Sequence, residues 1–152
     1  MKAQLSWQKN MEFLCDNHGI KTLIDATPEH GGQQLAPTPK ELILNAMMGC
    51  TAMDVVSILQ KMRQEITDFS MEVEAVKTTQ YPTHFSSAEL VYLLKGPIDP
   101  EKAIKAVDSS LTKYCGVNYM ISKTCKLSFR INLNNQDIKT GSVQFIEPKP
   151  EE

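Results

Sequence analysis

Residues 37 to 63, PTPKELILNAMMGCTAMDVVSILQKMR, constrain the fold more than any other part of the chain. The apolar residues recur with helical spacing and, between Leu42 and Leu59, occupy most directions around a helix axis. A helix that is apolar nearly all round must be covered on every side. The segment therefore predicts a long helix that is buried in a core or between subunits.

The start of this helix carries three local signals. Thr38 can act as N-cap, Pro39 then stands at the first helical position, and Glu41 follows three residues after the cap. Together they predict a capping box, and we expect the helix to run from there to about Gln64. A capping role is also the simplest explanation for Glu41.

One polar stripe interrupts the apolar surface of the predicted helix. Asp54, Ser57 and Lys61 follow Cys50 by four, seven and eleven positions, so all four side chains project within roughly 60° of one another. Cys50 is either a small hydrophobe at the inner end of this stripe or a nucleophile. A nucleophilic role requires a thiolate, which an ionised Asp54 would oppose, so a cation would have to come from elsewhere in the fold or from another subunit.

The rest of the chain predicts one further long helix and several strands. Asp99 as N-cap and Pro100 at the first helical position begin the second helix, which ends at Cys115, and a short helical piece follows Gly116. The expected strands are residues 2–7, 11–15, 20–25, 69–78, 84–96, 125–133 and 142–146. This order predicts an α+β fold with an antiparallel sheet around the long helix.

Length and charge limit the organisation and the partners. The 152 residues fit one domain, which we expect over residues 1–146, with a polar, proline-rich disordered tail over 147–152. The net charge of -2 gives no positive field for nucleic acid or an anionic membrane. The first residues lack the apolar core of a secretory signal, and no run approaches a membrane span, so we expect a soluble, cytoplasmic protein.

The histidines and the remaining cysteines limit which kinds of metal or thiol site the chain can form. His18, His30 and His84 have no spacing that resembles a zinc or haem motif, so we predict no metal site and no cofactor. Cys15 and Cys125 fall on the apolar faces of strands, which favours a structural role. Cys115 closes the second helix, where a thiol is less confined than inside a strand, although the spacing alone does not pair it with another sulfur.

Two stretches taken together resemble a known family. The run LAPTPKELILNAMMGCTAMDVVSILQKMR and the later run KYCGVNYMISKTCKLSFRINL, whose Cys115 follows Cys50 by 65 residues, are similar to the osmotically inducible protein C and organic hydroperoxide resistance family. The segment GCTAMDVVSIL resembles the OsmC-like members of less certain activity more than it resembles the hydroperoxide resistance proteins. The resemblance covers most of the chain, from the first strands to the strand at 125–133.

The resemblance implies an intertwined homodimer and a thiol peroxidase. In that mechanism Cys50 attacks an organic hydroperoxide and becomes a sulfenic acid, which condenses with Cys115 to a disulfide that an external dithiol reduces. Glu41 and Asp54 are the predicted supporting residues. Glu41 lies one position after the family's glutamate, where this chain has Lys40.

The sequence does not identify the cation that would stabilise the Cys50 thiolate. The family has an arginine in the N-terminal region, whereas no arginine precedes Arg63 here. The candidates are Lys9, Lys21, His18 or a basic residue of the second subunit. The alternative function is a non-catalytic dimeric binding module of the same fold for a small apolar or thiol-containing ligand. A purely structural scaffold fits the polar stripe less well.

Overall fold

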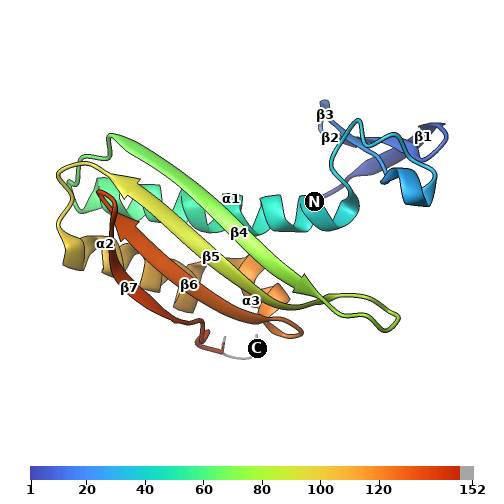
Figure 1. Cartoon of the computed structure of the whole chain (residues 1–152). Helices are drawn as coiled ribbons and strands as arrows, with labels where there is room; N and C mark the ends of the chain where they lie inside the picture. Colours follow the sequence, from blue (N-terminus) through green and yellow to red (C-terminus); the bar gives the residue numbers. More distant parts are fainter. Residues whose placement is uncertain (148–152) are drawn as a thin grey trace, which may run out of the picture. The chain divides into compact units, whose positions relative to one another are not determined.

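A computed structural model describes residues 1–147 (Figure 1). The chain divides into two compact units, one from Met1 to Asn45 and one from Ala46 onward, and each is described by itself. The single domain expected over residues 1–146 stays a prediction. Residues 148–152 of the expected tail lie outside the described residues, while Glu147 accepts a hydrogen bond from Tyr119 Oη at 2.8 Å.

The first unit contains an antiparallel meander. Strands β1 (Gln4–Lys9), β2 (Glu12–Asn17) and β3 (Ile20–Ile24) pair in the order β1-β2-β3, as predicted. The turn between β2 and β3 places His18 and Gly19 at positive φ angles of 58° and 87°. The Asp16 carboxylate supports this turn, because its Oδ1 accepts a hydrogen bond from the Gly19 N–H at 2.7 Å.

Asp25 organises the loop after β3, which includes the short 3-10 helix η1 (Pro28–His30). Its buried carboxylate accepts hydrogen bonds from the backbone N–H groups of Ala26, Gln33 and Leu35 at 2.7, 3.0 and 3.1 Å. The hydrogen bond from Leu35 has the largest effect, and together these bonds hold the pKa of Asp25 below its ordinary value. One side chain thus joins two ends of a loop that also has backbone hydrogen bonds of its own, such as that from the Gln34 N–H to the Ala26 carbonyl at 3.1 Å.

Helix α1 (Pro39–Lys61) begins as predicted. The Thr38 N–H donates to Glu41 Oε2 at 2.7 Å and the Glu41 N–H donates to Thr38 Oγ1 at 3.4 Å, which is a capping box. The helix ends a few residues before Gln64, because Arg63 takes a positive φ of 56°.

The second unit contains a four-stranded sheet that is mixed rather than antiparallel. Strands β4 (Asp68–Lys77), β5 (Phe85–Lys95), β6 (Lys126–Leu133) and β7 (Gln136–Ser142) lie in this order, and β5 and β6 run parallel. The antiparallel prediction is therefore wrong for the central pair. The physical reason is the long helical connection from β5 to β6, which returns the chain to the same end of the sheet.

The last strand was also predicted in the wrong place. Asn134 and Asn135 both take positive φ angles and form a tight turn after β6, so the chain reverses at once into β7. The segment expected as a strand, residues 142–146, lies mostly beyond β7 and is not a strand. The two asparagines were the available turn signal.

Three helical segments form the connection between β5 and β6. Helix α2 (Pro100–Ser109) is capped as predicted, since Asp99 Oδ1 accepts from the N–H groups of Glu101 and Lys102. A π-helical turn, η2 (Ser110–Tyr114), then leads to Cys115, and helix α3 (Gly116–Ser122) follows. The predicted second helix thus has a wider turn at its end.

The hydrophobic core of the second unit lies between the sheet and the helices, which Figure 1 shows on one face of β4 to β7. Alternate residues of the two central strands are buried: Ala88, Leu90, Tyr92, Leu94, Leu127, Phe129, Ile131 and Leu133. Helix α1 buries a single line of side chains, namely Met47, Thr51, Val55 and Leu59. Within the described residues the helix is therefore not covered on every side, and Met53 is 71% exposed.

Helix α1 is also long and apolar enough, by length and composition alone, to cross a membrane. The core helices of soluble proteins pass the same test, so this observation is weak evidence by itself. The expectation that no run approaches the length of a membrane span nevertheless does not hold for the 23 residues of α1.

Candidate functional site

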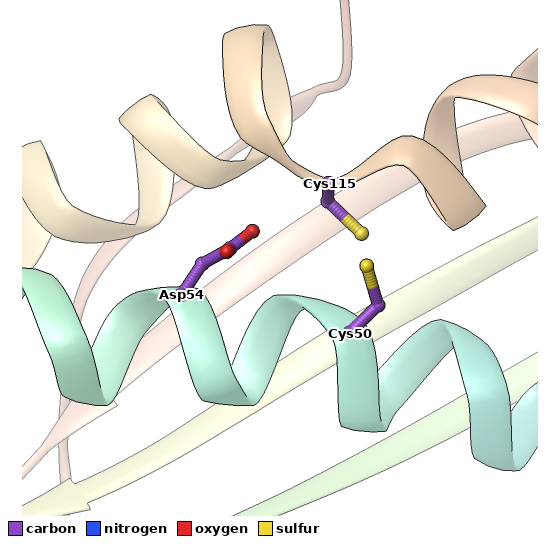
Figure 2. Close-up of side chains that lie close together, drawn as sticks. All are labelled: Cys50, Asp54 and Cys115. Atoms are coloured by element: carbon purple, nitrogen blue, oxygen red, sulfur yellow. The ribbon is translucent and has the colours of Figure 1, made fainter.

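Three of the predicted site residues come together in the second unit. One Sγ atom each from Cys50 and Cys115 and a carboxylate oxygen of Asp54 all lie within 4.8 Å of one another. Figure 2 shows the two sulfur atoms pointing toward each other, with Asp54 one helical turn from Cys50 on α1. The i, i+4 spacing on α1 accounts for one pair, whereas the approach of Cys115 depends on the tertiary fold.

The π-helical turn positions Cys115. Its N–H donates to the Ser110 carbonyl at 2.9 Å, a bond that spans five residues, and the backbone then becomes extended at Cys115. The sulfur accepts a hydrogen bond from the Asn118 N–H at 3.5 Å, and the side chain is 1% exposed. Cys50, by contrast, is only partly buried.

A chain of buried hydroxyl groups holds the Asp54 carboxylate. Ser110 Oγ donates to Asp54 Oδ2 at 2.8 Å, and the same Oγ lies 2.9 Å from Thr51 Oγ1. Thr51 Oγ1 in turn lies 2.8 Å from the Tyr92 hydroxyl, whose pKa burial raises above its ordinary value. Thr51, Ser110 and Tyr92 were not predicted, and no sequence signal marked them, because their contacts join residues that lie 41 to 59 positions apart.

The surroundings keep Cys115 protonated at neutral pH. Burial first, and the neighbouring Cys50 thiol second, raise the pKa of Cys115 to about 12, with a smaller contribution from the Asp54 charge. The Asn118 N–H acts in the opposite direction, but does not outweigh burial. Cys115 is therefore suited to react as a neutral thiol rather than as the first nucleophile.

Two cavities reach the cluster. One, of about 460 Å³, is lined by Asp54, Ser57 and Lys61, so the polar stripe predicted on α1 faces a cavity. The other, of about 510 Å³, reaches Cys115 and has a mainly apolar lining that includes Tyr119 and Phe145. One cavity thus reaches the Cys115 side of the cluster and the other reaches its carboxylate, and neither is lined by Cys50.

The other predicted site residues do not join the cluster. Glu41 is engaged as the capping residue of α1, and its hydrogen bonds with Thr38 lower its pKa. Cys125 is 4% exposed and burial raises its pKa, which agrees with a structural role, while Cys15 lies partly buried on β2.

No cation is paired with the cluster among residues 1–147. None of the ion pairs in that range involves Asp54. Lys61 and Lys105 share the cavity at Asp54, and Lys113 lines the cavity at Cys115. Two thiols and one carboxylate in contact can carry out thiol and disulfide chemistry or hold a cation.

Comparisons with known proteins agree with the resemblance read from the sequence. The chain is 34% identical to Protein YhfA of Escherichia coli (strain K12) over 130 residues, which cover 84% of this chain and 94% of that protein. A solved structure of a hypothetical protein from Aquifex aeolicus VF5 matches with a TM-score of 0.75 and 24% identity, covering 88% of this chain and 96% of that one.

A third comparison concerns a protein whose description includes a function. The structure of an organic hydroperoxide resistance protein OsmC from Legionella pneumophila matches with a TM-score of 0.66 and 16% identity, covering 86% of this chain and 94% of that one. At such low identity the likeness shows the fold alone. The family model described as OsmC-like protein matches residues 31–130, which is most of the chain and includes both site cysteines. The protein belongs to the OsmC-like family.

Proposed function

We propose that the protein is a homodimeric thiol peroxidase that reduces organic hydroperoxides through Cys50 and Cys115. The observation that carries the proposal is the approach of the two sulfur atoms, which lie within 4.8 Å although their residues are far apart in the sequence. Of the four free cysteines, Cys50 and Cys115 also have the Asp54 carboxylate beside them, and one cavity reaches Cys115 while another reaches Asp54.

The reaction balances with one hydroperoxide for each dithiol. The Cys50 thiolate attacks the terminal peroxide oxygen, the O–O bond breaks, and the products are a sulfenic acid on Cys50 and an alcohol. The Cys115 thiol then attacks the sulfenic sulfur and water leaves, so that a disulfide forms. An external dithiol reduces this disulfide, which requires a reducing compartment such as the cytoplasm.

The two thiols differ in the way this sequence of steps requires. Cys50 is partly exposed, so a peroxide can reach it, whereas Cys115 is buried and its raised pKa keeps it from competing for the substrate. The apolar lining of the cavity at Cys115 favours an alkyl or aryl hydroperoxide over hydrogen peroxide.

The uncovered face of α1 supports the dimer. Ala52, Met53 and Val56 line a shallow, mainly apolar depression of about 370 Å³ in this unit. Exposed apolar surface of this kind is typical of an interface between subunits. A second copy is also a possible source of the cation that the cluster lacks among the described residues.

The second candidate function is a binding module for a small apolar or thiol-containing ligand. The missing ion pair at the cluster and the apolar cavity at Cys115 favour it. In that case both thiols would stay reduced in the presence of a hydroperoxide.

Mass spectrometry distinguishes the two. After one equivalent of cumene hydroperoxide, the intact mass should fall by two hydrogens, and peptide mapping should join Cys50 to Cys115. The Cys50→Ser variant should consume no peroxide, while Cys115→Ser should accumulate a sulfenic acid that dimedone traps.

The Cys125→Ser variant is the matched control and should behave as the parent. Unchanged thiols in the parent protein would reject the peroxidase in favour of the binding module. A disulfide that involves Cys15 or Cys125 instead would contradict the assignment of the two residues.

A further inference from the structure

We propose that reduced Cys50, Cys115 and Asp54 form a binding site for a thiophilic divalent cation of the Zn²⁺ type. This inference does not depend on the peroxidase activity. The prediction of no metal site considered spacing along the sequence, whereas these three ligands are brought together by the tertiary fold.

The donor set and its spacing fit such an ion. Zinc binds cysteine sulfur at about 2.3 Å and carboxylate oxygen at about 2.0 to 2.2 Å, so a tetrahedral ion holds these atoms roughly 3.5 to 3.8 Å apart. The three ligand atoms lie within 4.8 Å of one another and need only small rotations to close on one ion. Two sulfur ligands select a soft or borderline cation over Mg²⁺ or Ca²⁺.

The groups around the ligands orient them. Ser110 Oγ donates to one oxygen of Asp54 at 2.8 Å and lies 2.9 Å from Thr51 Oγ1, which in turn lies 2.8 Å from the Tyr92 hydroxyl. The Asn118 N–H donates to the Cys115 sulfur at 3.5 Å. Outer hydrogen bonds of this kind set the direction and the basicity of metal ligands.

The charge of the cluster favours a cation as well. Asp54 has no ion pair among residues 1–147, so its carboxylate can attract a cation. A divalent ion that binds there would displace the thiol protons, because cysteine binds such a metal as the thiolate. A fourth position would stay open to water from the cavity at Asp54.

Binding and oxidation exclude each other. A disulfide between Cys50 and Cys115 removes both sulfur ligands, so oxidation would release the ion, and the bound ion would shield both thiols from hydroperoxides. The site would thus couple the redox state of the pair to metal occupancy.

The experiment uses the full-length, fully reduced protein with Co²⁺ as a spectroscopic probe and Zn²⁺ in competition. We expect one ion per chain, with thiolate charge-transfer bands of two-sulfur intensity and the visible bands of tetrahedral Co²⁺. Cys50→Ser and Cys115→Ser should each lose tight binding, Asp54→Asn should weaken it, and Ser110→Ala should weaken it by about 10- to 100-fold.

Matched controls are Cys125→Ser and Asp108→Asn, which should bind as the parent does once circular dichroism shows that every variant is folded. Binding that survives in the Cys50→Ser, Cys115→Ser double variant, or that Asp54→Asn leaves unchanged, would overturn the proposed ligand set. Absence of tight binding in the reduced parent would overturn the site altogether. A disulfide that forms with hydroperoxide but without metal binding would reject this inference alone, whereas metal binding without peroxide oxidation would reject only the proposed function.

Discussion

The two sheets of this chain bury their side chains very differently. Every residue of β1 is exposed, and its large side chains Leu5 and Trp7 are 61% and 66% exposed. In the four-stranded sheet, Leu90 and Ile131 are completely buried. The second sheet therefore has a hydrophobic core of its own, which also supports both site cysteines, whereas the first sheet gains little from burial within the chain.

Truncation of a core side chain in the four-stranded sheet should give the largest loss of stability, and the same change on β1 should give almost none. We expect Leu90→Ala to lower the free energy of unfolding by about 2 to 5 kcal/mol, because it leaves a cavity in a packed core. Leu5→Ala on β1 should change it by less than about 0.5 kcal/mol. Urea titration at low protein concentration measures both, and equal losses would show that β1 is as tightly packed as β5.

Removal of a hydroxyl group should have the second largest effect. Thr51→Val leaves the buried Tyr92 hydroxyl without its partner, so we expect a loss of about 1 to 3 kcal/mol. Ser6→Ala removes an exposed hydrogen bond to the Leu14 carbonyl on the first sheet and should stay within about 0.5 kcal/mol. A small effect for Thr51→Val would mean that water replaces the hydroxyl in the second unit.

Acid should act first on the unit that contains Asp25. The pKa of this carboxyl is lower in the folded protein than its ordinary value of 3.8, so its contribution to stability is complete above that value and is lost as the pH falls below it. Amide hydrogen exchange of residues 26–35 should accelerate relative to the amides of β6 only as the pH falls below about 3.8.

The Asp25→Asn variant should lack most of this dependence on pH while its one amide oxygen still accepts from the N–H groups of Gln33 and Leu35. Acceleration of similar size in the variant would assign the acid sensitivity to another group.

The alkylation rates of Cys15 in the first sheet and Cys115 in the second unit should also differ, although this measurement does not depend on a change in stability. Cys15 on β2 is partly exposed and should react with iodoacetamide at neutral pH. Cys115 is buried and its pKa is raised to about 12, so its labelling should become appreciable only above about pH 10. Peptide mapping against pH measures both rates, and rapid labelling of Cys115 at pH 7 would contradict its assignment as the resolving thiol.

The sequence predicted those features that depend on local physics. The capping residues of α1 and α2 mark the starts of both helices, because each side chain satisfies N–H groups only two or three residues away. The alternation in β6 likewise identified the buried face of the strand. The parallel pairing of β5 and β6 could not be read in this way, since pairing direction depends on the path of the whole connection.

The candidate site likewise contains residues that local spacing brings together and residues that only the tertiary fold brings together. Cys50 and Asp54 share a face of α1 because of helical spacing, which the sequence contains. The position of Cys115 was supplied by the family resemblance, and the Ser110, Thr51 and Tyr92 chain joins three separate elements whose contact no local pattern encodes.

The π-helical turn before Cys115 has a consequence for how this protein can evolve. Such a turn holds one more residue than an α-helical turn, so loss of a single codon within residues 110–114 would let the helix continue regularly. Because the Cys115 N–H bonds the Ser110 carbonyl, the shortened turn would keep this bond over four residues instead of five and leave the direction of Cys115 nearly unchanged. A relative whose connection is one residue shorter could therefore keep the same two sulfur atoms side by side.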